Sequence, residues 1–198
     1  DYYFGARNTV YGDFDDGERF AYFSKAALAA LYYLDFKPDV LHCHDWQAGL
    51  VPLYLRTRFE NTPIGSARSI VTIHNLRFQG ICGIEHLKYW TGLPDYLFDY
   101  PVLKQNENEA NMFKGGLAYA DKITTVSETY AQEIQTSFYG EGLNGHLYYH
   151  RPKLTGIVNG IDVGVWNGDT DKLLAADCNY DTVLEKKIEN KRALQDQL

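Results

Sequence analysis

The sequence lacks three features that would link it to a membrane or to nucleic acid. Its longest apolar runs fall well short of the roughly 18 residues that a membrane-spanning helix needs. Its first residues lack the charged, apolar and small-residue layout of a signal peptide. It also lacks a basic excess, because 19 Lys and Arg face 26 Asp and Glu, for a net charge of −7. Binding to DNA or RNA depends on cationic side chains that displace phosphate counterions, so this balance argues against a nucleic-acid partner.

Cysteine is scarce, and no methionine starts the chain. Cys43, Cys82 and Cys178 are odd in number, widely spaced and without a C-x-x-C pair. This pattern predicts free thiols in a reducing compartment, rather than a disulfide framework or a zinc ribbon. The chain starts at Asp1 and runs directly into aromatic-rich sequence. We therefore expect it to be a piece of a longer protein.

What the sequence does contain is an alternation of short β-branched runs and longer helical patterns. Strands are expected at 39–43, 69–73, 122–126 and 154–160, and helices at 18–36, 46–59, 106–121, 128–138 and 181–198, with loops from 74 to 105. Pro52 is compatible with a helix only near its first turn. The alternation predicts an α/β fold, with a Rossmann-like parallel sheet and helices on both of its faces.

Polar residues follow the expected strands at their carboxyl ends. Asp45 follows the first strand, His74 and Asn75 the second, Ser127 the third, and Asn159 lies in the fourth. Ligands of open parallel sheets bind in the crevice at this edge. The pattern therefore predicts that the chain contributes to a binding site there, although capping residues also collect at such ends.

A metal site is one interpretation of the run "DVLHCHDW" at 39–46. His42 and His44 share one face of a strand, and His74 is a candidate third ligand of a catalytic zinc ion. No carboxylate cluster completes a binuclear site. The alternative, which we favour, is that His42 is a hydrogen-bonded core histidine and that Val40, Leu41 and Cys43 form the strand core.

Three further patterns lead to no catalytic prediction. Ser127 lacks the G-x-S-x-G elbow of a serine nucleophile and is better placed as a helix N-cap. A glycosidase pair of carboxylates, such as Asp45 with Glu85 or Asp95, finds no support in their spacing. The run "KGGL" at 114–117 lacks the phosphate-loop frame. Its two glycines are instead expected to allow close packing of a helix against the sheet.

Six segments together resemble the family of bacterial glycogen synthases and plant starch synthases. They are "DVLHCHDWQAGLVPLYLR", "VTIHNLRFQG", "ADKITTVSETYAQEI", "YGEGL", "GIVNGIDVGVW" and "ENKRAL". The resemblance covers essentially the whole chain, including "YGDFDDGERFAYFSKAAL". It implies one half of a GT-B glycosyltransferase, in which two Rossmann-like domains face each other across a cleft. The implied reaction transfers glucose from ADP-glucose to the non-reducing end of an α-1,4-glucan, with retention of configuration and without a metal or other cofactor.

The resemblance also implies roles for individual residues, through the motifs that they match. His74 would contact the glucosyl unit by its main-chain carbonyl and its ring, and Asp45 would line the cleft on the acceptor side. Substrate-binding roles are implied for five further residues: Asn75, Asn159, Tyr11, Gln79 and Gly80.

Two segments of the family pattern are expected outside this chain. The K-x-G-G-L loop that contacts the donor phosphates lies upstream of Asp1, and the nucleotide-binding C-terminal domain lies downstream. Residues 1–180 are thus expected to form part of the N-terminal domain, and 181–198 a helix leading toward the second domain. We expect this piece alone to be inactive. The location would be cytoplasmic in a bacterium and plastidic in a plant. A UDP-glucose-dependent relative and a non-catalytic glucan-binding module are the alternatives.

Overall fold

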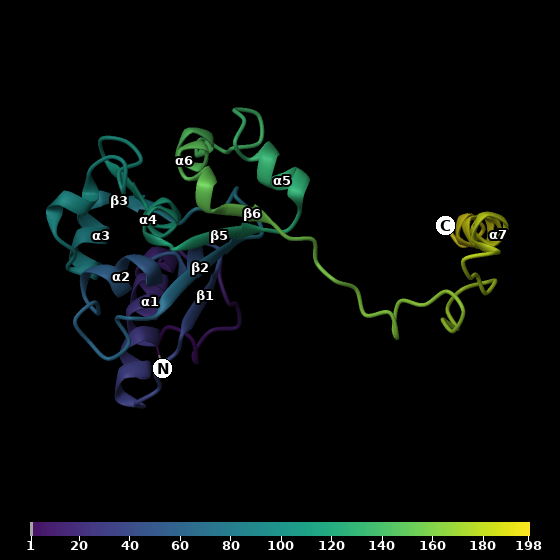
Figure 1. The fold of residues 1–198 in the computed structure, drawn as a ribbon, viewed down its shortest axis with the longest axis horizontal. Coiled ribbons are helices and arrows are strands. Elements are labelled where there is room, and N and C mark those ends of the chain that lie inside the picture. The colour runs from purple at the N-terminus through teal and green to yellow at the C-terminus, as the bar shows by residue number, and fades with distance from the viewer. Residues whose placement is uncertain (1) are drawn as a thin grey trace. The chain divides into compact units, whose positions relative to one another are not determined.

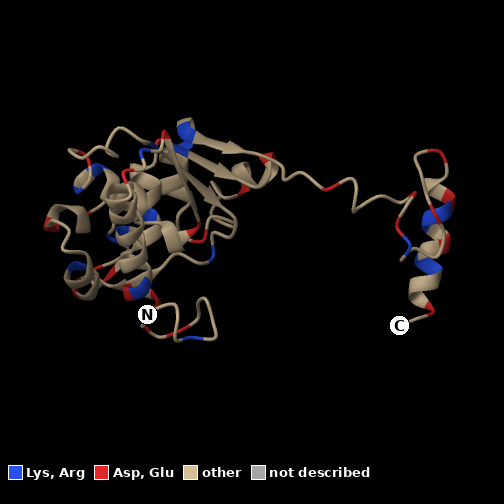
Figure 2. Cartoon of the chain, turned by 90° about the horizontal axis from the view of Figure 1, so that it is seen from below, with Lys and Arg blue, Asp and Glu red and all other residues tan. Residues whose placement is uncertain are grey.

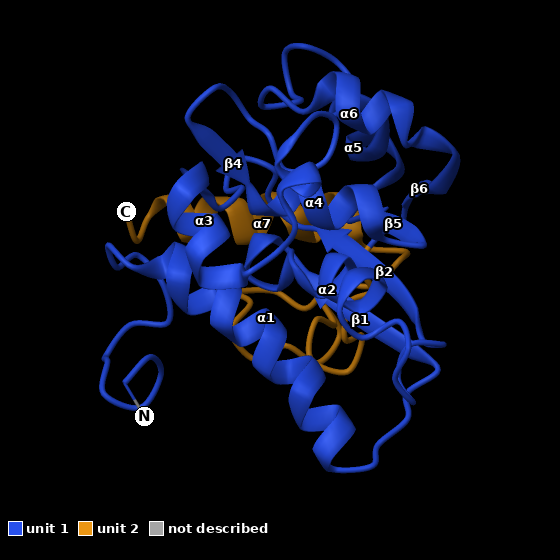
Figure 3. Ribbon diagram, turned by 90° about the vertical axis from the view of Figure 1, so that its left-hand side faces the viewer, with its two compact units in different colours: residues 1–158 blue, residues 159–198 orange. Residues whose placement is uncertain are grey.

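The computed structural model describes residues 2–198, which divide into two compact units. The first unit ends at Val158, and the second covers Asn159–Leu198 (Figure 3). Acidic and basic residues are interspersed along the ribbon of the first unit (Figure 2). No helix among the described residues has the length and apolar character needed to cross a membrane. Cys43, Cys82 and Cys178 are free thiols, as predicted.

The first unit is built on a parallel sheet of four strands in the order β1 (Val40–His44), β2 (Arg68–Ile73), β5 (Lys122–Thr125) and β6 (Leu154–Gly156) (Figure 1). His44 lies opposite Thr72 in the register of β1 and β2, and Thr72 lies opposite Thr124 in β5. The predicted α/β class and parallel sheet are confirmed. The last strand ends at Gly156, so that the "VNG" segment at 158–160 follows it.

The helices of the first unit share one hydrophobic core with one face of the sheet. Cys43, Val71, Ile73 and Ile123 supply the sheet side of this core. The helices that contribute buried residues to it include α1 (Asp16–Tyr33), α2 (Val51–Thr57), α4 (Met112–Tyr119) and α6 (Asn144–Tyr149). Helix α5 (Glu128–Glu133) begins at Ser127, whose Oγ accepts a hydrogen bond from the Tyr130 amide at 2.9 Å and confirms the predicted N-cap.

The opposite face of the sheet is largely open in the part of the chain that the structure describes. Each strand is added on the same side of its predecessor, and right-handed crossovers then place every connecting helix on the same face. The helices therefore cover only one face of the sheet, whereas the sequence predicts helices on both faces. Val40 lies on the open face and is 49% exposed, so its predicted place in the core is wrong, whereas Cys43 is buried.

The segment from 74 to 121 contains more regular structure than predicted. Strand β3 (Ile81–Gly83) leads into helix α3 (Ile84–Thr91), where loops are expected, and a 3-10 turn covers Asp95–Phe98. The helix predicted at 106–121 starts only at Met112, because β4 (Glu109–Asn111) pairs antiparallel with β3. The Asn111 side chain then caps α4 by accepting a hydrogen bond from the Lys114 amide at 2.9 Å.

Gly116 lets α4 approach the segment that follows β1. That segment is a 3-10 turn, η1 (Trp46–Ala48), followed by Gly49 and then by α2, with Pro52 in its first turn as expected. A Cβ atom on Gly116 would lie 1.9 Å from the Gly49 carbonyl oxygen. Close packing at this glycine is thus confirmed, but α4 packs there against the backbone of Gly49 and not, as predicted, against the sheet.

The second unit is dominated by helix α7 (Val183–Gln195). The Asn190 side chain exchanges two hydrogen bonds with the Ala176 backbone, one as acceptor at 3.0 Å and one as donor at 2.8 Å. None of the helix residues is buried, and its apolar residues Leu184, Ile188 and Leu194 are all exposed.

Candidate functional site

Asp45 connects the carboxyl ends of β1 and β2. Its carboxylate Oδ1 accepts hydrogen bonds from the main-chain amides of His74 at 2.8 Å and Asn75 at 3.3 Å. Its own amide donates to the Thr72 carbonyl at 2.9 Å. The backbone of Asp45 has φ of 53° and ψ of −167°, a conformation that residues other than glycine rarely adopt. The carboxylate therefore defines the turn that carries His74 and Asn75.

A hollow of about 370 Å³ lies beside this turn and contains three of the predicted site residues, Tyr11, Asp45 and Asn75. Gly12, Asp16, Trp46, Gln47 and Phe78 complete its lining. The mixture of aromatic rings, carboxylates and amides is suited to a sugar, which has apolar ring faces and many hydroxyl groups. A second hollow of about 410 Å³ shares Asp16, Trp46 and Phe78 with the first and extends toward Trp90.

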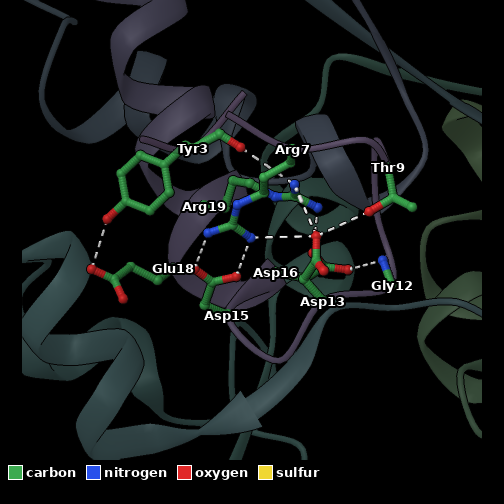
Figure 4. Close-up of polar contacts among 9 residues, drawn as sticks. All are labelled: Tyr3, Arg7, Thr9, Gly12, Asp13, Asp15, Asp16, Glu18 and Arg19. Carbon is green, nitrogen blue, oxygen red and sulfur yellow. Dashed lines mark hydrogen bonds and ion pairs between the residues drawn. The ribbon is translucent and has the colours of Figure 1, made fainter. Parts of the chain in front are cut away.

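The loop that carries Tyr11 is attached to the start of α1 by a network of charged side chains (Figure 4). The Arg7 guanidinium donates two hydrogen bonds to the Asp15 carboxylate, and this bonding lowers the pKa of Asp15. Arg19 is fully buried and donates to Asp16, while the other carboxylate oxygen of Asp16 accepts from the Gly12 amide at 2.6 Å. Tyr11 itself is 64% exposed. The network thus holds the loop and leaves the Tyr11 ring open to a ligand.

Gln79 and Gly80 lie in the same turn, but the Gln79 side chain is buried and fully bonded within the protein. Its Nε2 donates to the Leu76 carbonyl at 3.0 Å and to the Glu141 carbonyl at 2.9 Å. Its Oε1 accepts from Asn111 at 2.6 Å. Gly80 has φ of 62°, and a Cβ atom there would lie 2.3 Å from the Trp46 ring. Both residues line the second hollow, but the side-chain amide of Gln79 is engaged by protein atoms.

Three histidines line up on the open face of the sheet. His42 Nε2 lies 2.7 Å from Thr72 Oγ1, which confirms the predicted hydrogen bond, although the His42 side chain is exposed and not part of the core. His44 Nδ1 lies 2.9 Å from His74 Nε2. Burial, and then the proximity of His42 and His74, lowers the pKa of His44. Over residues 2–198, no group of three or more His, Cys, Asp or Glu side chains has an arrangement that would hold a metal ion.

Asn159 differs from the other predicted site residues, because it is the first residue of the second unit. It is exposed, and it precedes a turn in which Asp162 Oδ1 accepts hydrogen bonds from the amides of Gly164 at 2.9 Å and Val165 at 3.2 Å. His44 and Phe78, in contrast, are among the neighbours of the site to which the family resemblance assigns no role. The signal for His44 was its strand spacing from His42, which placed both rings on one face.

Comparison with known proteins gives consistent results. A family model described as the starch synthase catalytic domain matches residues 1–149. A glycogen synthase of Lachnospira eligens is 48% identical over 199 residues, which cover 100% of this chain and 41% of that protein. A glycogen synthase of Bacillus cereus strain Q1 is 46% identical over 196 residues, which cover 98% of this chain and 40% of that protein.

A solved structure also matches. It is the catalytic domain of starch synthase IV from Arabidopsis thaliana bound to ADP and acarbose, with a TM-score of 0.80 and 39% sequence identity. The match covers 97% of this chain and 39% of that one. The chain thus spans about two fifths of the length of the relatives that it matches.

Proposed function

The chain belongs to the starch synthase catalytic domain family, and from that we propose that it is part of a retaining glucosyltransferase. The donor would be ADP-glucose and the acceptor the non-reducing end of an α-1,4-glucan. The observation that carries this proposal is the meeting of Tyr11, Asp45 and Asn75 around one hollow at the carboxyl ends of β1 and β2. The nucleotide and the glucan-like inhibitor named for the Arabidopsis structure support the same two substrates.

We propose that His74 is the residue closest to the reaction. Glucosyl transfer places negative charge on the departing ADP and positive character on the sugar, so fixed polar groups at these positions stabilise the transition state. The main-chain amide of His74 is bonded to Asp45, which gives the backbone of His74 a defined orientation. Asn75, whose Oδ1 accepts from the Arg77 amide at 3.1 Å, supports the turn. Tyr11 lies on the acceptor side with Asp45.

Gln79, Gly80 and Asn159 have different parts in this proposal. Gln79 and Gly80 act on the substrate through the shape of the turn, because the Gln79 amide is bonded within the protein. Asn159 would face the donor once the second domain is present. Residues 1–180 would form part of the N-terminal domain of a GT-B enzyme, and 181–198 would lead to its second domain. In the cell, we place the enzyme in the cytoplasm of a bacterium or the plastid of a plant.

The test is glucose incorporation from labelled ADP-glucose into glycogen by the full-length protein and by two variants. His74→Ala should lose about 10²-fold or more of kcat while the protein stays folded, because the variant removes a group that meets the transition state. His86→Ala is the matched control, since His86 is an exposed histidine on α3 outside both hollows, and it should retain full activity.

Each result has a distinct meaning. A full-length protein that transfers glucose only from UDP-glucose would refute the donor assignment. One that transfers glucose from neither donor would refute the proposal that it is a glucosyltransferase. Full activity in His74→Ala would refute the role of that residue. Transfer by the 198-residue chain alone would refute the need for the second domain.

A further inference from the structure

The open face of the sheet carries a continuous row of polar side chains that ends at His74. His42 and His44 lie two residues apart on β1 and so point to the same face, where His44 is in register with Thr72. Thr124 Oγ1 lies 2.6 Å from Thr72 Oγ1, which in turn lies 2.7 Å from His42 Nε2. The rings of His42 and His44 are 4.3 Å apart at their centroids and tilted by 32°.

Within this row, His44 contacts the ring of His74 directly. Its Nδ1 lies 2.9 Å from His74 Nε2, and the two ring centroids are 5.2 Å apart. Asp45, the next residue along the chain, bonds the main-chain amide of His74. Two successive residues at the end of β1 thus hold the two parts of His74: Asp45 holds the backbone and His44 holds the ring.

We propose that His44 is a positioning residue for glucosyl transfer, which fixes the rotamer and the tautomer of the His74 imidazole. The proposal rests on the proposed function, since it assigns His44 a task only if His74 meets the sugar. The proposal requires no contact between His44 and the substrate. It acts through the hydrogen bond to His74 Nε2, which leaves Nδ1 as the ring nitrogen of His74 available to a ligand.

The hydrogen bond between the two rings couples the tautomer of His74 to that of His44. A hydrogen bond between two imidazole nitrogens contains one proton, so one ring donates and the other accepts. The charged and titratable neighbours of His44 are His42 and His74, which disfavour its cationic form, and Asp45, which favours it. Burial acts in the same direction as the two histidines and outweighs Asp45, so that His44 stays neutral near pH 7. A neutral His44 either donates or accepts through Nδ1, and its role sets the opposite role for His74 Nε2.

The remaining contacts make the position of His44 itself well defined. The His42 ring packs against it, and His42 is bonded to the Thr72 hydroxyl, which is itself bonded to the Thr124 hydroxyl. A side chain fixed by packing and by outer hydrogen bonds keeps a reacting group within a fraction of an ångström of its productive place. A displacement of about 1 Å can cost on the order of 10²-fold in rate.

The experiment compares His44→Leu and His44→Asn in the full-length protein. Leucine fills the space but makes no hydrogen bond, whereas the asparagine amide places a polar atom close to the position of Nδ1. We expect His44→Leu to lower kcat by about tenfold or more, with little change in the KM for ADP-glucose, and His44→Asn to restore most of kcat. In ¹⁵N-histidine NMR spectra, His74 should show one tautomer in the wild type and a mixture in His44→Leu.

Three results would overturn the proposal. One is a kcat in His44→Leu that matches the wild type. A second is equal loss in His44→Leu and His44→Asn with the His74 tautomer unchanged, since that result means a role in folding alone. The third is a mixture of His74 tautomers in the wild type. If the wild type itself transfers no glucose, it is the proposed function that fails, whereas the NMR spectra still decide whether His44 sets the tautomer of His74.

Discussion

Replacing Gly116 by alanine tests how closely α4 must approach the backbone that follows β1. A Cβ atom at this position would lie 1.9 Å from the Gly49 carbonyl oxygen, 2.8 Å from its carbonyl carbon and 3.1 Å from its Cα. All three are backbone atoms, which have no rotamer to change, so α4 or the turn before α2 must shift. Helix α4 carries Phe113 and Leu117 of the core, and a shift would therefore loosen their packing as well.

The expected cost follows from two opposing effects. Overpacking of a close contact costs up to about 3 kcal/mol, and a clash between backbones belongs at the upper end of that range. Alanine in a helix gains back about 1 kcal/mol over glycine. We therefore expect Gly116→Ala to lower the free energy of unfolding by about 2 kcal/mol. At Gly115 the nearest atom is the mobile end of Leu103, at 2.4 Å, so Gly115→Ala should cost less.

Gly145→Ala is the matched control, because Gly145 lies in α6 and a Cβ atom there meets no other heavy atom within 4 Å. It should be neutral or stabilising by up to about 1 kcal/mol. Urea-dependent hydrogen exchange of α4 amides in the full-length protein, read by mass spectrometry, measures the opening of this region separately from other domains. A Gly116→Ala variant within about 0.5 kcal/mol of the wild type would refute the inference that this contact is tight.

Two further predictions concern the same core. Burial lowers the pKa of His146 to about 3, and the charges of His150, Lys114 and Lys153 act in the same direction. Burial and the charge of Lys153 lower the pKa of His150 to about 4. Both rings therefore stay neutral in the folded protein, while the unfolded chain protonates below pH ~6.5. The contribution of the two rings to the free energy of unfolding should be fully present above that pH and fall as the pH drops toward 4, by up to about 1.4 kcal/mol per pH unit for each ring. Urea unfolding from pH 7 to 5 measures this slope. The slope should flatten in the His146→Phe, His150→Phe double variant. Asn111→Ala should destabilise by about 2–4 kcal/mol in urea unfolding, because it removes the cap of α4 and leaves the buried oxygen of Gln79 without its donor; a change below 1 kcal/mol would contradict that sum.

Most of the parallel sheet and its long helix could be predicted from the sequence, because their signals are local. In α1 the apolar residues recur at helical spacing, and Phe20 and Leu28 are buried in the core as a consequence. The strands at 68–73 and 122–125 are rich in β-branched residues, and these two strands and the one at 40–44 are all followed closely by polar residues. The Ser127 cap follows from the chemistry of one hydroxyl and one unpaired amide, and needs no distant contact.

The segments that were missed depend on partners far along the chain. Strand β4 replaces the first turn of a predicted helix only because β3, about 28 residues earlier, supplies its hydrogen bonds. Gln79 has the residue type of a sugar ligand, but its amide is enclosed by carbonyls of Leu76 and Glu141 that the sequence does not bring together. The contact of His44 with His74 likewise requires the register of two strands.

At Asp45 the backbone conformation lowers stability, while the side chain is needed for the site. A conformation that favours glycine costs any other residue on the order of 1–3 kcal/mol. Replacement by glycine would relieve that backbone cost, but it would also remove the carboxylate that sets the His74 turn. In a screen that rewards both properties, aspartate would persist in spite of its cost. Position 45 thus carries a residue that is kept for its carboxylate and not for its backbone preference.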